Sequence, residues 1–132
     1  MAPARPHLKR VYATSGDDDG TRILVDRLWP RGISRDKARI DLWLKDIAPS
    51  DALRKRFHKK PEAWQEFRAA YFEELGAPAA RAAVKELLAR LRRGPVTLLY
   101  AARDEQRNNA EALRMWLERR KPQRVAAKEE RS

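Results

Sequence analysis

Two stretches of this chain are apolar on both faces of an extended backbone. Residues 23–25 are ILV, inside the segment TRILVDRLW (21–29), and residues 96–101 are VTLLYA. A strand with one solvated face alternates apolar and polar side chains, whereas a strand covered on both faces is continuously apolar. The two runs therefore predict neighbouring parallel strands at the centre of a sheet, over residues 22–28 and 96–101.

The rest of the chain predicts helices and weaker strands. Apolar residues recur at helical spacing in two long segments, and a glycine that can end a helix follows each of them. Ser50 is a typical N-cap, and Pro122 is expected to end the last helix. Residues 40–44 (IDLWL) fit a strand or a helix, and we favour the strand. The expected helices are 51–57, 62–75, 79–93 and 109–120, and the weaker strands are 9–14 and 40–44.

Helical connections between apolar strands are typical of α/β folds. We therefore expect a small mixed or mainly parallel sheet flanked by helices. The length of 132 residues fits a single compact domain. Its expected parts are a loose leader (1–8), the α/β domain (9–121) and a flexible basic tail (122–132).

Composition excludes several classes of chemistry. The chain has no cysteine, so disulfides and thiolate sites are ruled out. His7 and His58 lie in different segments and do not form a metal-ligand pattern, so neither a metal nor another cofactor is expected. No apolar run approaches the length of a membrane span, and no signal peptide is recognisable. We expect a cytoplasmic protein with no membrane partner, of unspecified oligomeric state.

The net charge of +11 suggests a nucleic-acid partner, but the charge is concentrated at the ends. Residues 1–10 and 119–132 together carry +7, so residues 11–118 carry only +4. No helix-turn-helix and no stacking motif is apparent. Nucleic-acid binding through the basic ends, as in a small transcriptional regulator, is therefore the alternative function, and a plain interaction domain is a third.

The preferred function comes from the loops that follow the two central strands. Ligands of open α/β sheets bind beyond the carboxyl ends of the strands, where such loops meet helix N-termini. Here residues 26–32 and 103–109 would form one cleft that suits a phosphate or another anion. We expect Arg27 and Asp104 to share this cleft. The candidate ligand-binding residues are Asp26, Arg27, Trp29, Arg31, Arg103, Asp104, Asn108 and Asn109.

Each candidate also has a structural interpretation. Asp26 and Arg27 are either a site pair or partners in ion pairs with Arg103 or Asp104, and a structural Arg27 predicts a loss of about 3–5 kcal/mol on truncation. Asn109 is more readily explained as an N-cap than as a ligand.

For the remaining notable residues a structural role is the preferred interpretation. Trp29 and Trp43 fit the core better than a pocket, and so do Tyr71 and Tyr100. Residues 17–19 (DDD) fit a solvated turn better than a cation site. Whether the chain is an enzyme stays open; in an enzyme, Asp26 or Asp104 would be the general base, and Arg27, Arg31 and Arg103 would hold the substrate charge.

Four segments carry a family resemblance over about residues 9–118: RILVDRLWPRG (22–32), DLWLKDIAPS (41–50), WQEFRAAYFEEL (64–75) and VTLLYAARDEQRNNA (96–110). They resemble the YeaO-like branch of the bacterial family called domain of unknown function 488. The resemblance implies a compact cytoplasmic α/β domain and no established activity. Other branches carry a Cys-His-Arg cluster at the start of the last helix, where this chain has Asn108, Asn109 and Ala110. Chemistry based on that cluster therefore does not transfer.

Overall fold

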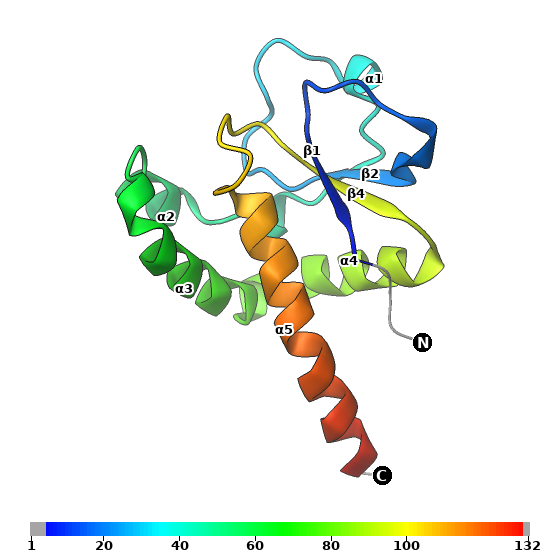
Figure 1. The fold of residues 1–132 in the computed structure, drawn as a ribbon, viewed down its shortest axis with the longest axis vertical. Coiled ribbons are helices and arrows are strands. Elements are labelled where there is room, and N and C mark those ends of the chain that lie inside the picture. The colour runs from blue at the N-terminus through cyan, green and yellow to red at the C-terminus, as the bar shows by residue number, and fades with distance from the viewer. Residues whose placement is uncertain (1–4, 131–132) are drawn as a thin grey trace.

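The computed structural model describes residues 5–130, with side chains described for residues 5–119. Its centre is a four-stranded sheet in the order β1-β4-β2-β3, and every neighbouring pair of strands is parallel. Figure 1 shows the sheet with helices grouped around it. The parallel sheet and the helices confirm the expected α/β class. The strands are β1 (His7–Arg10), β2 (Thr21–Leu24), β3 (Leu42–Trp43) and β4 (Val96–Tyr100).

The two central strands are the two apolar runs of the sequence. β2 and β4 pair in parallel, with Thr21 opposite Val96 and Leu24 opposite Leu99. The Val25 amide extends the ladder by donating to the Leu99 carbonyl at 3.1 Å. The prediction that these segments are adjacent at the sheet centre is confirmed. β3 pairs with β2, so the strand interpretation of residues 40–44 is also right, although the strand is short.

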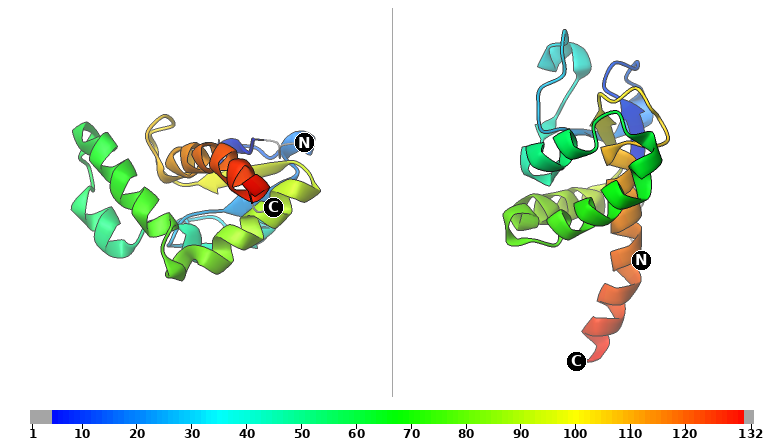
Figure 2. Two further views of the ribbon diagram at one scale, coloured as in Figure 1. Left: turned by 90° about the horizontal axis from the view of Figure 1, so that it is seen from below. Right: turned by 90° about the vertical axis from the view of Figure 1, so that its left-hand side faces the viewer.

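The two faces of the sheet bury different side chains, which explains the continuous apolar runs. Ile23 and Leu98 face a large cluster formed with three helices, α3 (Trp64–Leu75), α4 (Arg81–Arg93) and α5 (Asn109–Glu130). Leu24 and Leu99 face a smaller cluster closed by Ile40 and by the short helix α1 (Arg35–Ala38). Figure 2 shows these covering layers from two further directions. Both faces of the sheet are therefore buried at β2 and β4.

The remaining helices largely follow the sequence pattern. Helix α2 (Asp51–Arg56) begins after Ser50, whose Oγ accepts from the Leu53 amide at 3.1 Å as an N-cap. The same hydroxyl donates to Glu74 Oε2 at 2.6 Å, which ties the start of α2 to α3. A 3-10 turn precedes each of the next two helices, at Pro61–Ala63 and Pro78–Ala80.

Both ends of the folded domain depart from expectation. β1 begins at His7, inside the expected leader, because it pairs with β4 through tertiary hydrogen bonds that no local pattern indicates. Residues 11–14 form a turn instead of a strand, and Ala13 N donates to Arg10 O at 2.9 Å. Helix α5 continues past Pro122 to Glu130; a proline removes one helical hydrogen bond, and the helix formers that follow it favour continuation. Side-chain packing in the expected tail, residues 122–132, lies outside the described residues.

The acidic turn Asp17–Asp19 is only partly solvated, which corrects the expectation for this triplet. Asp17 and Asp18 are exposed, whereas Asp19 is buried and pairs with Arg22 and Lys9 at 2.5 and 2.9 Å. Asp19 is buried because its carboxylate neutralises the buried guanidinium of Arg22 in β2. Within the described residues, no group of three or more His, Asp or Glu is placed to hold a metal ion. None of the described helices is both long enough and apolar enough to cross a bilayer.

Candidate functional site

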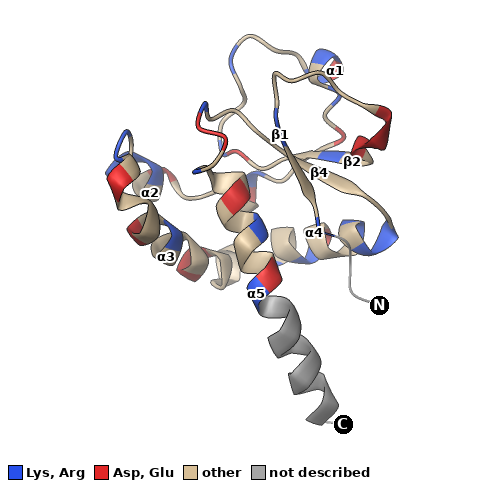
Figure 3. Ribbon diagram, in the orientation of Figure 1, with Lys and Arg blue, Asp and Glu red and all other residues tan. Residues whose placement is uncertain are grey.

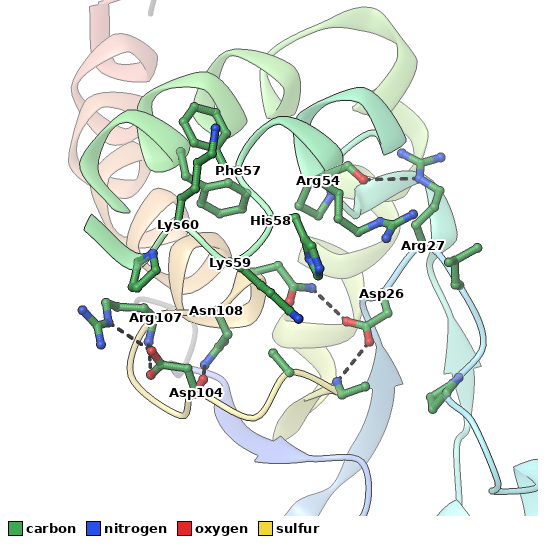
Figure 4. Close-up of a pocket in the computed structure, with 18 of the residues that line it drawn as sticks. Asp26, Arg27, Arg54, Phe57, His58, Lys59, Lys60, Asp104, Arg107 and Asn108 are labelled. Atoms are coloured by element: carbon green, nitrogen blue, oxygen red, sulfur yellow. Dashed lines mark hydrogen bonds and ion pairs between the residues drawn. The ribbon is translucent and has the colours of Figure 1, made fainter. Parts of the chain in front are cut away.

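A pocket of about 680 Å³ lies at the carboxyl ends of β2 and β4, beside the first turn of α5. Figure 4 shows the residues that line it. Three segments form most of its wall: residues 26–31 after β2, residues 101–109 after β4, and residues from the α2–α3 region. The first two segments are the loops predicted to form a cleft, and the structure brings them together.

Asp26 lies where three elements of the site meet. Its carboxylate accepts hydrogen bonds from the Ala101 amide and from the Asn109 side-chain amide, both at 3.0 Å. Burial raises the pKa of Asp26, and the two hydrogen bonds lower it only in part. Asp26 thus links the end of β2 to the end of β4 and to α5, while still lining the pocket.

The two asparagines at the start of α5 both have structural hydrogen bonds. Asn108 is the cap: its Oδ1 accepts from the Glu111 amide at 2.8 Å. Asn109 instead donates to the Val25 carbonyl at 2.9 Å and to Asp26. The expectation that Asn109 is the N-cap is therefore wrong by one residue, because the Asn109 side chain is used to hold the end of β2.

Arg27 and Asp104 both line the pocket, as predicted, but neither is the other's ion-pair partner. Arg27 donates to the Ala48 carbonyl at 3.0 Å and lies 3.7 Å from the exposed Asp46 carboxylate. Asp104 pairs with Arg107 at 3.0 Å. Backbone hydrogen bonds from Arg107 and Gln106 lower the pKa of Asp104.

Replacing Arg27 by alanine is expected to lower the free energy of unfolding by about 1–2 kcal/mol. The variant loses hydrogen bonds to Ala48 and Pro49 but leaves no buried carboxylate alone, because Asp46 is 72% exposed. The estimate of 3–5 kcal/mol from sequence required a buried partner. Urea denaturation measures the loss; a value above about 3 kcal/mol would show that Arg27 neutralises a buried charge after all.

The two tryptophans near the strands combine core and pocket roles. Trp29 lines the pocket, donates to the Ile33 carbonyl at 2.8 Å and packs edge-on against Trp43 with ring centroids 5.2 Å apart. Trp43 donates to the Asp26 carbonyl at 2.7 Å. Tyr71 is buried in the core, as expected, where its hydroxyl donates to the Ile47 carbonyl and burial raises its pKa. Tyr100 is likewise buried.

Two of the arginine candidates, Arg31 and Arg103, differ in their position relative to the pocket. Arg31 lines the pocket and is exposed, whereas Arg103 is exposed but is not among the lining residues. Arg103 belongs to the loop after β4, and its place in the site stays a prediction. Strand order alone does not decide which side chains of a loop face the cleft.

One wall of the pocket was missed by sequence reasoning. Residues 54–60 (RKRFHKK) and two aromatics of the following helix, Trp64 and Phe67, line this wall or flank it. The available signal was the run of five basic residues around Phe57 and His58. It went unused because such a run at the end of an amphipathic helix is normally a solvated surface.

The charged side chains of the pocket are mainly basic. Six Lys and Arg residues and two Asp residues line it, a net charge of +4 with His58 neutral. Figure 3 shows the basic residues of α2 and the following loop gathered at this corner of the molecule. Within residues 5–119, the charged groups of Arg31, Lys59 and Lys60 have no hydrogen-bond or ion-pair partner. These three groups are available to a ligand.

Comparison with known proteins gives a family without an assigned function. The model of the family described as the inactive DUF488-N3 subclade matches residues 5–132. An uncharacterised protein of Mycobacterium tuberculosis strain H37Rv is 44% identical over 109 residues, which is 83% of this chain and 90% of that protein. The uncharacterised protein YeaO of Escherichia coli K12 is 43% identical over 109 residues, 83% of this chain and 93% of YeaO. No solved structure gives a significant match.

The matched regions contain the β2 loop, the β4 loop and the start of α5, so the resemblance expected from the sequence is confirmed. This chain belongs to the DUF488 family, within the subclade described as inactive DUF488-N3.

Proposed function

We propose that this protein binds a small anionic ligand, of the phosphate type, in the pocket at the carboxyl ends of β2 and β4. The observation that carries the proposal is the set of unpaired cations Arg31, Lys59 and Lys60, which reach one pocket from two different segments. Unpaired cations near one another repel, and an anion relieves that repulsion. The positive end of α5, a long helix, adds to the same potential.

Binding without chemistry is the mode that the lining residues support. No Ser or Thr hydroxyl and no thiol lies among the described lining residues. Asp26 is engaged by Ala101 and Asn109, and Asp104 by its own loop and Arg107. Neither carboxylate therefore resembles a free general base, and the imidazole of His58, which also lines the pocket, has no Ser, Thr or Cys among the described lining residues to activate. The description of the subclade as inactive agrees with a binding role.

The test is ligand-induced stabilisation by phosphate, pyrophosphate and citrate. A ligand present at 100 times its dissociation constant adds about 2.7 kcal/mol to the free energy of unfolding. The double variant Lys59→Gln/Lys60→Gln is expected to bind these anions at least tenfold more weakly, because it removes two of the three unpaired cations.

The matched control is Lys37→Gln/Lys85→Gln, which removes the same charge from two exposed lysines outside the pocket. It should bind the anions as the native chain does. Equal losses in both double variants would mean that only overall charge matters, and no stabilisation by any of the three anions would refute the proposal.

The alternative, nucleic-acid binding through the basic ends, rests on residues that lie largely outside the described side chains. Six of the described basic residues line the pocket, and none of these six belongs to the basic ends. Removing residues 122–132 should therefore leave anion binding to the pocket unchanged. If the truncation abolishes binding, the basic tail is the anion contact instead.

A further inference from the structure

The pocket has an apolar side that an inorganic anion would not need. Tyr12 and Leu28 are the exposed large hydrophobic residues of the described chain, at 43% and 57% exposure, and both line this pocket. Deeper in the wall, Trp64 and Phe67 stack with ring centroids 5.8 Å apart and an interplanar angle of 17°. Exposed apolar side chains gathered at one pocket are typical of a binding surface for an apolar group.

The size of the pocket supports a ligand larger than an anion. Its volume of about 680 Å³ falls within the range of sites that bind whole organic molecules. A phosphate ion held by Lys60 or Arg107 would leave most of this space to water. The aromatic wall and the volume together indicate an organic ligand that carries a ring.

Asp26 places a hydrogen-bond acceptor in the wall of the pocket. Figure 4 shows Arg54 and His58 beside Asp26 and Lys59 pointing toward it, with Lys60 and Arg107 on the other side. Each Asp26 oxygen accepts one hydrogen bond from the protein, which leaves acceptor capacity on both oxygens. A bare anion is repelled by this carboxylate, whereas a group with N–H donors is attracted. The ligand therefore needs donors at one end and negative charge at the other.

We infer that the ligand is a nucleoside monophosphate, with its base against the aromatic wall of Trp64 and Phe67 and toward Asp26, and its phosphate toward the unpaired Lys60. The inference rests on the proposed function, since it assigns a chemical class to the anion. Guanine is the base whose ring N–H and amino group can donate side by side to one carboxylate. The same chemistry occurs in a free nucleotide and at the 5′-phosphorylated end of a strand.

The test is calorimetric titration with GMP, ribose 5-phosphate, guanosine and inorganic phosphate. GMP is expected to bind at least tenfold more tightly than ribose 5-phosphate or phosphate, because contacts between bases and aromatic side chains are favourable. Guanosine should also bind more weakly than GMP, because it lacks the negative charge that Arg31, Lys59 and Lys60 attract.

Two variants separate the base from the phosphate. Leu28→Ala changes an uncharged side chain that is 57% exposed, so the fold should tolerate it; GMP affinity should fall several-fold and phosphate affinity should not change. Asp26→Asn should remove the preference for GMP over ribose 5-phosphate. The Leu28→Ala variant keeps every charge of the pocket, so phosphate binding is its internal control. Asp26→Asn removes a negative charge, so its readout is the ratio of the GMP and ribose 5-phosphate affinities, since both ligands carry the phosphate.

The outcomes distinguish this inference from the proposed function. Equal affinities for GMP and ribose 5-phosphate overturn the nucleotide inference and leave the anion site in place. Guanosine binding as tightly as GMP overturns the anion site, and no binding by any of the four overturns both. A 5′-phosphorylated oligonucleotide that begins with guanosine and binds more tightly than GMP would identify the nucleotide as a strand end; weaker binding would identify it as free.

Discussion

Replacing Arg22 by alanine should lower the free energy of unfolding by about 3–5 kcal/mol, as removal of one partner from a buried ion pair does. Arg22 carries a charge, yet it lies in the central strand β2 and is only 4% exposed. Its guanidinium pairs with Asp19 at 2.5 Å and donates to the Ala38 carbonyl at 2.6 Å and the Arg39 carbonyl at 3.0 Å. The variant leaves these buried acceptors without their donor.

The matched control is Arg90→Ala on helix α4. Arg90 is also ion-paired, with Glu86 at 2.7 Å, but both side chains are partly exposed and one helical turn apart. Such a pair contributes less than about 1 kcal/mol. Urea denaturation of both variants gives the comparison. Similar losses would show that Arg22 is no more important to the fold than a surface arginine.

The Asp19–Arg22 pair also predicts a dependence on pH. Burial alone would raise the pKa of Asp19, but hydrogen bonds from Gly16, Lys9 and Arg22 outweigh it and lower the pKa to about 2 from 3.8. A lowered pKa stabilises the folded state above the unfolded-state value, and this contribution is lost as the pH falls from about 4 to about 2. The stability advantage of the native chain over Asp19→Asn should therefore shrink by about 2 kcal/mol across that window.

The second large effect is expected at Gly20, which joins the acidic turn to β2. Its φ of +67° with ψ of −140° disfavours any residue with a Cβ, and a Cβ built there would lie 2.2 Å from the backbone oxygen of Pro95. Thr21 donates to that same oxygen at 3.0 Å, so the two central strands cannot separate without breaking the ladder. Gly20→Ala should cost about 3–5 kcal/mol, from backbone strain and overpacking together.

Gly32 provides the matched control for this prediction. Its φ is +72°, nearly the same as that of Gly20, but a Cβ there would meet nothing within 4 Å. Gly32→Ala should therefore cost only the strain, about 1–2 kcal/mol. Thermal unfolding of the two variants separates strain from collision. A Gly20→Ala protein as stable as Gly32→Ala would mean that the strands adjust around the added methyl group.

The sequence pattern was sufficient for the fold class because the strongest signals were local. The runs at 23–25 and 96–101 are apolar on both faces. Such side chains are needed because three helices cover one face of the sheet and α1 covers the other, so both faces of these strands are buried. Ser50 could be recognised as an N-cap because its hydroxyl acts within one helical turn. For the same reason the pattern placed α3, α4 and the start of α5 to within about two residues.

The sequence predicted where a pocket would lie but not all of the segments that form its wall. Parallel neighbours bring their carboxyl ends to one edge, so the loops after β2 and β4 had to meet once the two strands were adjacent. Which side chains of those loops face the pocket depends on loop geometry, and Arg103 is not among the lining residues. The basic wall of residues 54–60 was missed because it reaches the pocket from a different helix–loop connection.

What the sequence alone determined is what depends on spacing along the chain: the period of the helices, the double-sided burial of two strands and the meeting of their loops. Tertiary structure decided the contacts that spacing along the chain does not indicate. It buried Asp19 beside Arg22, moved the α5 cap from Asn109 to Asn108 and paired β1 with β4. These outcomes depend on where a backbone carbonyl or a buried charge lies in space, and residue type and periodicity carry no information about that position.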